Sequence, residues 1–426
     1  MTDGGGTDDG MTDGIADGGG THGGMADGGG THGMADSGGT DPDAAAPSPG
    51  GPPPLLLRLL RSRTARAVTA AGLVGALLGA GTVAWRTDTL PLLSSAPCWG
   101  AFDDALTTQV FGDLETSAET QRLRTDPRAR VASYGQCRVT SYQDDGRAAR
   151  QLTVRVHELS GTSRTAAKAW TDDFLQPGMV AMGNGLPGMA SGARAWLALP
   201  QSCTGEPDLL ATPTVVDLTM GEADIGAMQE YERKDRRALS AAAVAVTNKV
   251  LRERGCSGTY SAPERTDTVV AWDDTDPAAL CGIKGLRLPT GYRERLPRTR
   301  VGPDGGAARV CEAGSSYPPG ELRLTTVVDP VLAHVFALEA SHGGTPLRGG
   351  QGPGPGGFGA IDVTRGVYVA SCQTGDVVFL VERLKDIGDA KARETNLVRS
   401  LLPRYVEAEA ERIGCGPIRL TLPDLV

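Results

Sequence analysis

Hydrophobic and polar positions divide the chain into three parts. The first 57 residues are low-complexity, residues 67–85 (AVTAAGLVGALLGAGTVAW) form an apolar run without a formal charge, and the remainder shows the apolar patterning of a globular region. A helix rises about 1.5 Å per residue, so the run would be roughly 28 Å long, close to the hydrocarbon thickness of a bilayer. The pattern therefore predicts a transmembrane helix over residues 67–85.

The first 57 residues are predicted to be disordered. They contain nine Asp, no Lys, Arg or Glu, and a near-repeat built on ADGGGTHG. A Gly-rich segment of this kind cannot bury enough apolar surface to offset the entropy lost on ordering it. The strict GGxGxD register of calcium-binding repeats is absent. We therefore expect a spacer here, with no metal site.

Basic residues flank the apolar run on one side only. Four arginines lie within the juxtamembrane segment 58–66, whereas only Arg86 and Asp88 follow the run closely. The positive-inside rule then places the N-terminus in the cytoplasm, with a linker over 86–95 leading to extracytoplasmic domains. The competing interpretation is a signal peptide cleaved after Ala84, but the run is longer than a usual signal-peptide core. We favour a retained single-pass anchor in the cell membrane.

Two glycines give the predicted membrane helix a face of small residues. Gly75 and Gly79 form a GxxxG pattern, which lets two helices pack closely. The pattern is common by chance in spans rich in Ala and Gly. It is therefore a weak indication of a homodimer through this helix.

All eight cysteines follow the apolar run, and their spacing indicates an internal duplication. Gaps of 39, 66 and 53 residues are followed, after a break of 25, by gaps of 30, 61 and 43. Outside the cytoplasm, an even number of cysteines favours disulfides over metal ligands. Sequence alone allows three pairings for each set of four, and pairing neighbours is the simplest. The neighbour pairs are Cys98 with Cys137, Cys203 with Cys256, Cys281 with Cys311, and Cys372 with Cys415.

Helical spacing near the end of each cysteine set supports the duplication. The apolar stripe within residues 239–246 reappears 159 residues later, within 398–405. A glycine stops each predicted helix just before the last cysteine of its set. Each half contains strand groups closed by this helix, which predicts an α+β fold. We expect repeat 1 over 96–260, a linker over 261–277 and repeat 2 over 278–426.

A glycine-rich segment occurs at a matching place in each half. These segments are residues 178–192 and residues 342–359. We expect both to be flexible rim loops, and flexible loops on a rigid scaffold often carry binding sites. They are the best indication of a binding site that the pattern offers.

Charge excludes one class of partner. The formal net charge of −9 equals the nine aspartates of the first 57 residues, which leaves 42 acidic and 42 basic residues from Arg58 onward. This balance gives no basic field to hold nucleic acid.

Motifs for catalysis are few. The GxGxxG at Gly183, Gly185 and Gly188 lacks the strand and helix of a dinucleotide site, so no cofactor is expected. The histidines after the apolar run are His157, His334 and His342. Ser191 or Ser341, with one of these and an Asp, would form a hydrolase triad only if the fold united them. Trp170 and Trp196 are expected in the core rather than on a sugar-stacking surface.

Several short segments resemble a known class of proteins. They are CWGAFDDAL at Cys98, CGIKGLRLP at Cys281, the strand GVYVASC and a final helix ending in GC. They resemble actinobacterial cell-envelope proteins that are anchored by a single helix or a lipid and carry four-cysteine domains of unknown function. The resemblance covers most of residues 96–420, implies an extracytoplasmic location and supplies no catalytic residue.

These observations favour an anchored, non-catalytic binding or sensing module of the cell envelope. Its partner would be an envelope protein or a small ligand. The alternatives are an extracytoplasmic hydrolase and a structural or division-associated envelope protein.

Overall fold

The computed structural model describes ten stretches of the chain. They are residues 96–124, 133–159, 164–176, 178–204, 213–222, 233–264, 271–315, 320–349, 356–385 and 396–423. All of them fall within one compact unit, Ala84–Val426. The predicted tail, basic segment and apolar run lie outside the described residues, as do Gly75 and Gly79. Of the helices that are described, none is long and apolar enough to cross a membrane.

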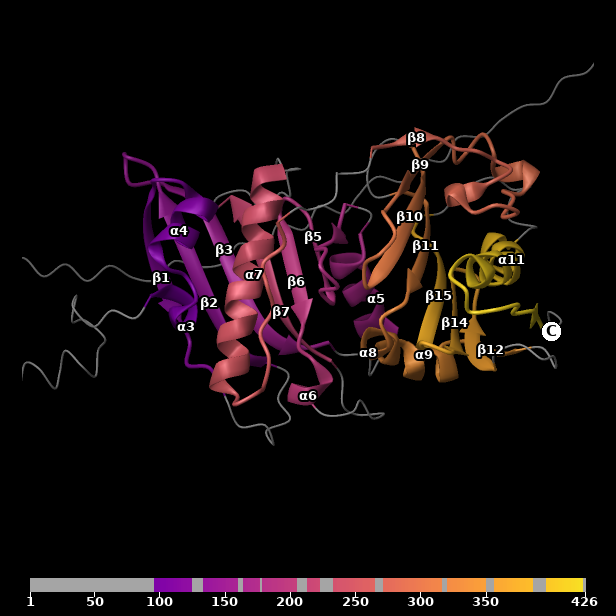
Figure 1. Cartoon of the computed structure of the whole chain (residues 1–426). Coiled ribbons are helices and arrows are strands. Elements are labelled where there is room, and N and C mark those ends of the chain that lie inside the picture. Colours follow the sequence, from indigo (N-terminus) through magenta and orange to yellow (C-terminus); the bar gives the residue numbers. More distant parts are fainter. Residues whose placement is uncertain are drawn as a thin grey trace, which may run out of the picture. The chain divides into compact units, whose positions relative to one another are not determined.

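The described region is α+β and contains two antiparallel sheets (Figure 1). Sheet A has seven strands in the order β1-β2-β3-β7-β6-β5-β4. Their bounds are β1 Glu115–Thr120, β2 Ser133–Tyr142, β3 Ala148–Glu158, β4 Val180–Ala181, β5 Gly188–Ala190, β6 Arg194–Ala198 and β7 Thr214–Glu222.

Sheet B has nine strands in the order β16-β12-β13-β14-β15-β11-β10-β9-β8. Their bounds are β8 Asp273–Asp274, β9 Arg298–Val301, β10 Ala308–Gly314, β11 Leu322–Val327, β12 Thr345–Gly349, β13 Gly357–Ile361, β14 Arg365–Cys372, β15 Gly375–Arg383 and β16 Leu420–Thr421. Because β8 pairs with β9, sheet B already begins within the segment predicted as a linker.

Helices precede, interrupt and follow each sheet. The helices of the half that contains sheet A are α3 Pro97–Gly100, α4 Asp104–Phe111, α5 Arg164–Phe174, α6 Gln201–Thr204 and α7 Arg233–Glu253. The helices of the half that contains sheet B are η1 Leu280–Gly282, η2 Thr290–Tyr292, α8 Pro330–Ala333, η3 His334–Phe336, α9 Ala337–His342 and α11 Leu397–Arg412. Asn396 caps α11, since its side chain accepts a hydrogen bond from the backbone of Arg399, and Pro403 lies inside this helix.

The strand order of sheet A recurs in sheet B. The seven strands of sheet A correspond in order to β9-β10-β11-β15-β14-β13-β12, and β8 and β16 extend the two edges. In both halves a helix follows β3 or its counterpart β11 (α5, or α8 to α9), and a long helix follows β7 or its counterpart β15 (α7 or α11). We call the two halves repeat 1 and repeat 2. The recurrence agrees with the cysteine spacing.

Four disulfides account for all eight cysteines. The bridges are Cys98–Cys137, Cys203–Cys256, Cys281–Cys311 and Cys372–Cys415, which are the neighbour pairs expected from the sequence. The first bridge of each repeat joins the segment before β1 to β2 in repeat 1, and the segment before β9 to β10 in repeat 2. The second bridge fastens the end of the long helix. The first cysteine of each repeat also has a left-handed backbone, with φ of 53° at Cys98 and 59° at Cys281.

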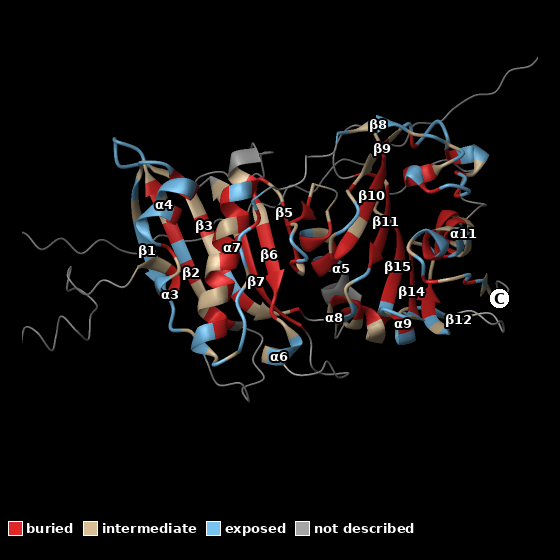
Figure 2. Cartoon of the chain, in the orientation of Figure 1, coloured by how far each residue is buried: buried red, intermediate tan, exposed pale blue. Residues whose placement is uncertain are grey.

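Three hydrophobic clusters form the interior. One lies between sheet A and the helices α4 and α7, and a second lies between sheet B and α11. The third is shared by both repeats, since it includes Trp170, Phe174 and Trp196 together with Phe336 and Leu380. Figure 1 shows α5 between the two sheets, and Figure 2 shows β11, β14 and β15 buried along most of their length. Helices and the shared core therefore cover both faces of the central strands of sheet B, whereas β1 at the edge of sheet A stays exposed.

The prediction of a flexible rim loop in repeat 1 is wrong. Residues 178–192 contain the buried strands β4 and β5, and Met179, Met182 and Met189 are each at most 2% exposed. These methionines supply the apolar surface that keeps the segment packed in the interior. In repeat 2, the matching segment 342–359 contains β12 and the start of β13, and its residues 350–355 lie outside the described part of the chain.

Candidate functional site

His157 lies beside a carboxylate, but that carboxylate is already occupied. The imidazole Nε2 is 3.9 Å from Oδ2 of Asp217, and Nδ1 is 3.0 Å from the carbonyl oxygen of Glu158. Asp217 accepts two hydrogen bonds from Arg194, of 2.9 and 3.0 Å. A bidentate arginine is the stronger partner. Asp217 is therefore committed to Arg194 rather than to orienting a histidine base.

Ser191 is a turn residue. Its Oγ accepts hydrogen bonds from the backbone N–H groups of Ala193 and Arg194, at 3.2 and 3.0 Å. The strand ladders place His157 in line with the Ala198 end of β6, whereas Ser191 precedes the opposite end. The fold therefore does not assemble a triad from Ser191 and His157.

Ser341 and His342 end helix α9, where both are exposed. Ser341 Oγ donates a hydrogen bond of 2.9 Å to the carbonyl oxygen of Ala337 within the helix. Among the described residues, no ion pair or hydrogen bond joins the His342 side chain to a carboxylate. His334 belongs to the short helix η3, packed between buried neighbours. Among the described residues, Ser341 and His342 thus have no carboxylate partner that would complete a triad.

Both tryptophans lie in the shared core, as predicted. Trp196 is fully buried, and its Nε1 donates a hydrogen bond of 3.0 Å to the carbonyl oxygen of Phe174. The Trp170 ring packs edge-on against Phe336 of repeat 2, with ring centroids 5.2 Å apart. These rings join the repeats and leave no aromatic face for a ligand.

The GxGxxG motif forms the turn between β4 and β5. Gly183 and Gly185 have φ of 86° and 67°, which only glycine adopts readily. A Cβ on Gly188 would lie 2.3 Å from the backbone oxygen of Trp196, so a side chain would collide with β6. The glycines therefore serve turn geometry and strand packing.

The two repeats share a polar feature that sequence reasoning missed. Arg194 opens β6, and Arg365 opens the equivalent strand β14. Three residues before each arginine, a side-chain oxygen accepts a hydrogen bond from the backbone N–H of that arginine. The acceptor is Ser191 Oγ in repeat 1 and Asp362 Oδ1 in repeat 2. Both arginines then reach a carboxylate. The signal was present as SxxR and DxxR, but it becomes visible only when the strands are aligned.

Arg365 holds two buried glutamates and reaches across to repeat 1. Its Nε and Nη2 donate hydrogen bonds of 2.6 and 3.1 Å to Glu339, and its Nη1 donates to Glu382. Nη1 also lies 3.4 Å from Thr171 Oγ1 on α5. Arg365 and both glutamates are at most 5% exposed. The arginine thus compensates charges that would otherwise be buried without a partner.

Arg323 forms the second link between the repeats. Its Nε and Nη2 donate hydrogen bonds of 3.1 and 2.9 Å to Glu312 in the neighbouring strand. Its Nη1 donates to Oδ1 of Asp172 at 2.9 Å, and it lies 3.4 Å from the carbonyl oxygen of Thr171. Cations are favoured at the C-terminal end of a helix, where carbonyl oxygens lack partners. The last turn of α5 is therefore held by arginines from repeat 2.

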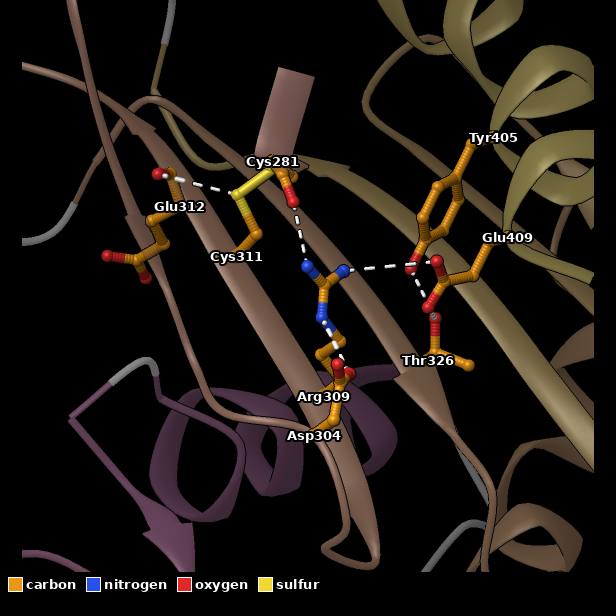
Figure 3. The surroundings of a disulfide bond; sticks show 8 residues. All are labelled: Cys281, Asp304, Arg309, Cys311, Glu312, Thr326, Tyr405 and Glu409. Carbon is orange, nitrogen blue, oxygen red and sulfur yellow. Dashed lines mark hydrogen bonds and ion pairs between the residues drawn. A yellow bond between two sulfur atoms is a disulfide. The ribbon is translucent and has the colours of Figure 1, made fainter. Parts of the chain in front are cut away.

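A further buried polar cluster lies behind the Cys281–Cys311 bridge (Figure 3). Glu409 is fully buried and accepts hydrogen bonds from Thr326, at 2.9 Å, and from Arg412, at 2.6 and 2.7 Å. The hydroxyl groups of Tyr405 and Thr326 form a hydrogen bond of 2.6 Å. Burial, with the nearby Glu409 carboxylate, raises the pKa of Tyr405 far above its ordinary value. The phenol therefore stays neutral.

Arg309 connects this cluster to the bridge. Its Nη2 donates a hydrogen bond of 2.7 Å to the carbonyl oxygen of Cys281, and its Nη1 lies 3.8 Å from Glu409. Alignment of the cysteines and of the long helices matches Arg309, Thr326, Tyr405 and Glu409 with residues 135, 156, 246 and 250 of repeat 1. Those positions hold glycine and three valines. The polar cluster is thus specific to repeat 2.

Asp329 is the half-buried N-cap of α8. Its Oδ1 accepts hydrogen bonds from the backbone of Val331 and Leu332, at 2.9 and 3.0 Å. Burial raises the pKa of Asp329, and the two backbone hydrogen bonds only partly oppose that rise. The folded state therefore binds this proton more tightly than the unfolded state does.

Asp329→Asn is expected to flatten part of the pH dependence of stability. A raised pKa in the folded state gives stability that is fully present below the ordinary aspartate pKa and is lost as pH rises through the folded value. Asparagine keeps the cap without the charge, so the variant should be more stable than the wild type near pH 7. Unfolding free energies of both proteins between pH 4 and 7 test this expectation. Parallel pH profiles would contradict it.

The described polar groups are mostly paired with one another. Within these residues, no group of three or more His, Cys, Asp and Glu side chains is placed to hold a metal ion. The paired arginines and carboxylates can fix one repeat against the other, but they present no free nucleophile or base. Comparison of the chain with family models, curated proteins and solved structures finds no match.

Proposed function

We propose that this chain is a membrane-anchored envelope protein whose two repeats lie outside the cytoplasm and act as a non-catalytic binding or sensing module. One observation carries the proposal: two polar side chains that could have formed a catalytic site instead cap a turn and hold an arginine within repeat 1. Asp217 holds Arg194, and Ser191 caps a turn. The partner is an envelope protein or a small ligand.

Cysteine chemistry supports the location. All eight cysteines form disulfides, and such bonds persist in oxidising compartments outside the cytoplasm. The apolar run 67–85, with arginines on its N-terminal side only, supports a single anchor with this orientation. The Asp- and Gly-rich residues 1–57 would then form a disordered cytoplasmic tail.

Protease digestion of intact cells tests the topology. The full-length chain carries one tag at its N-terminus and one at its C-terminus. We expect external protease to remove the C-terminal tag and to spare the N-terminal tag until the cells are opened. Loss of the N-terminal tag in intact cells would contradict the proposed orientation.

Activity-based labelling tests the absence of catalysis. Membranes containing the full-length chain are treated with a fluorophosphonate, which reacts with activated serines. We expect no labelling of the wild type, and identical results for Ser191→Ala and Ser341→Ala. Labelling that disappears in either variant would establish a hydrolase instead. A His157→Ala, His342→Ala double variant should also restore a deletion strain as fully as the wild type does.

A further inference from the structure

The segment between the first cysteine and the first full strand differs in charge between the repeats. In repeat 1 it spans residues 99–114 and carries three aspartates and no basic residue, a formal charge of −3. In repeat 2 it spans residues 282–297 and carries four basic residues and one glutamate, a formal charge of +3. We call these segments the acidic cap and the basic cap. They have equal lengths, equivalent positions and opposite charges.

The charged side chains of both caps are exposed. They are Asp103, Asp104 and Asp113 in the acidic cap, and Lys284, Arg287, Arg293, Glu294 and Arg295 in the basic cap. Buried residues hold each segment in place, including Phe102 and Leu106 in the acidic cap and Leu288 and Leu296 in the basic cap. The exposed charges therefore lie on segments whose backbone is held in place by buried neighbours.

Several of these charges form no ion pair with another described residue. In the described part of the chain, no ion pair involves Asp104 or Asp113 of the acidic cap, or Arg287 or Arg293 of the basic cap. Charges on the neighbouring strands are paired, since Glu119 of β1 lies 3.6 Å from Arg138 and Arg298 of β9 lies 3.5 Å from Asp274.

The two caps cannot neutralise each other within one molecule. The acidic cap packs with α7 in the cluster on the outer side of sheet A. The basic cap packs in the cluster between sheet B and α11. The shared core occupies the inner faces of both sheets, so the caps lie on opposite sides of it. Among the described residues, neither cap covers the charges of the other.

We propose that the basic cap of one molecule binds the acidic cap of a second copy of this chain. The contact is heterologous, because it joins two different surfaces, and it generates a chain of molecules or a closed ring. A second copy satisfies both caps, whereas an anionic lipid or polymer would leave the acidic cap without a partner. Complementary charge of this kind guides encounter and disfavours wrong partners.

Charge exchange tests the proposal in the detergent-solubilised full-length chain. One variant, Asp104→Lys with Asp113→Lys, has two basic caps. The other, Arg287→Glu with Arg293→Glu, has two acidic caps. Sedimentation velocity should show self-association of the wild type at low salt, weakened by about tenfold or more in each variant alone. Mixing the two variants in equal amounts should restore association between them.

A matched control separates cap charge from net charge. Asp144→Lys with Glu411→Lys makes the same total change as the acidic-cap variant, at exposed positions outside both caps. It should associate as the wild type does. Association that survives both cap variants, or that disappears only with Gly75→Leu and Gly79→Leu, would assign self-association to the predicted membrane helix and overturn the proposal. Failure of the mixed variants to associate would overturn it equally.

Discussion

Replacing Arg365 with alanine should destabilise the protein by about 3–5 kcal/mol, because the change leaves buried Glu339 without its cation and leaves Glu382 with only Arg323, whose Nη1 lies 3.9 Å away. Glu339 and Glu382 are 4% and 2% exposed, so water cannot replace the guanidinium without opening the interior. A loss of this size is a large fraction of the 5–15 kcal/mol that holds a typical domain folded. Denaturant titration of the oxidised protein, followed by tryptophan fluorescence, measures it, since Trp170 and Trp196 lie in the shared core.

Two further substitutions serve as controls for the Arg365→Ala measurement. Arg348 is an exposed arginine on β12, and Arg348→Ala should change stability by no more than about 0.5 kcal/mol. Arg365→Lys keeps the charge but loses the planar fork that meets Glu339 twice, so we expect only partial recovery. If Arg365→Ala cost less than about 1 kcal/mol, the two glutamates would not depend on this arginine, and its assigned role would be wrong.

Removing the Cys281–Cys311 bridge should cost about 3–4 kcal/mol. The bridge closes a loop with a sequence separation of 30 residues, and the chain-entropy estimate for such a loop falls in this range. The double variant Cys281→Ala, Cys311→Ala should also make the backbone of the basic cap more mobile. Without the bridge, the backbone at residue 281 can move away from Arg309, which now donates a hydrogen bond to its carbonyl oxygen. Denaturation measures the first effect, and hydrogen exchange of residues 282–297 measures the second.

A comparison between the repeats makes this prediction specific. Removing the Cys98–Cys137 bridge, with a separation of 39 residues, should cost a similar amount of stability but leave hydrogen exchange in the basic cap unchanged. Ser202→Ala, an exposed neighbour of Cys203, should change neither measurement. Equal loosening of the basic cap by both bridge deletions would show that the effect is global unfolding.

Sequence periodicity predicted the parts of the fold that depend on local pattern. The shift of 159 residues between the two long helices and the cysteine spacing indicated the repeated α+β arrangement and the pairing of neighbouring cysteines. Both signals arise from contacts that each repeat makes with itself. They survive in the sequence because an apolar stripe and a disulfide each require particular residue types at fixed spacing.

The polar interior could not be predicted in the same way. Arg323 and Glu382 stand at alternating positions of strands, which normally indicate side chains facing water. They are buried because α5 from repeat 1 and the helices of repeat 2 cover the inner face of sheet B, a contact between residues about 150 positions apart. The burial of residues 178–192 has the same origin, since a glycine-rich pattern gives no sign that three methionines will pack inside.

The shared core also has a consequence for how the chain is made. Synthesis completes repeat 1 before β14 and β15 exist, so the inner face of sheet A, including Trp196 and Val215, initially has nothing from repeat 2 to cover it. A newly formed apolar face of this kind is prone to aggregation until its cover arrives. The chain is therefore most prone to aggregation between the synthesis of repeat 1 and the synthesis of repeat 2. Truncation near residue 264 would leave the apolar inner face of sheet A exposed permanently.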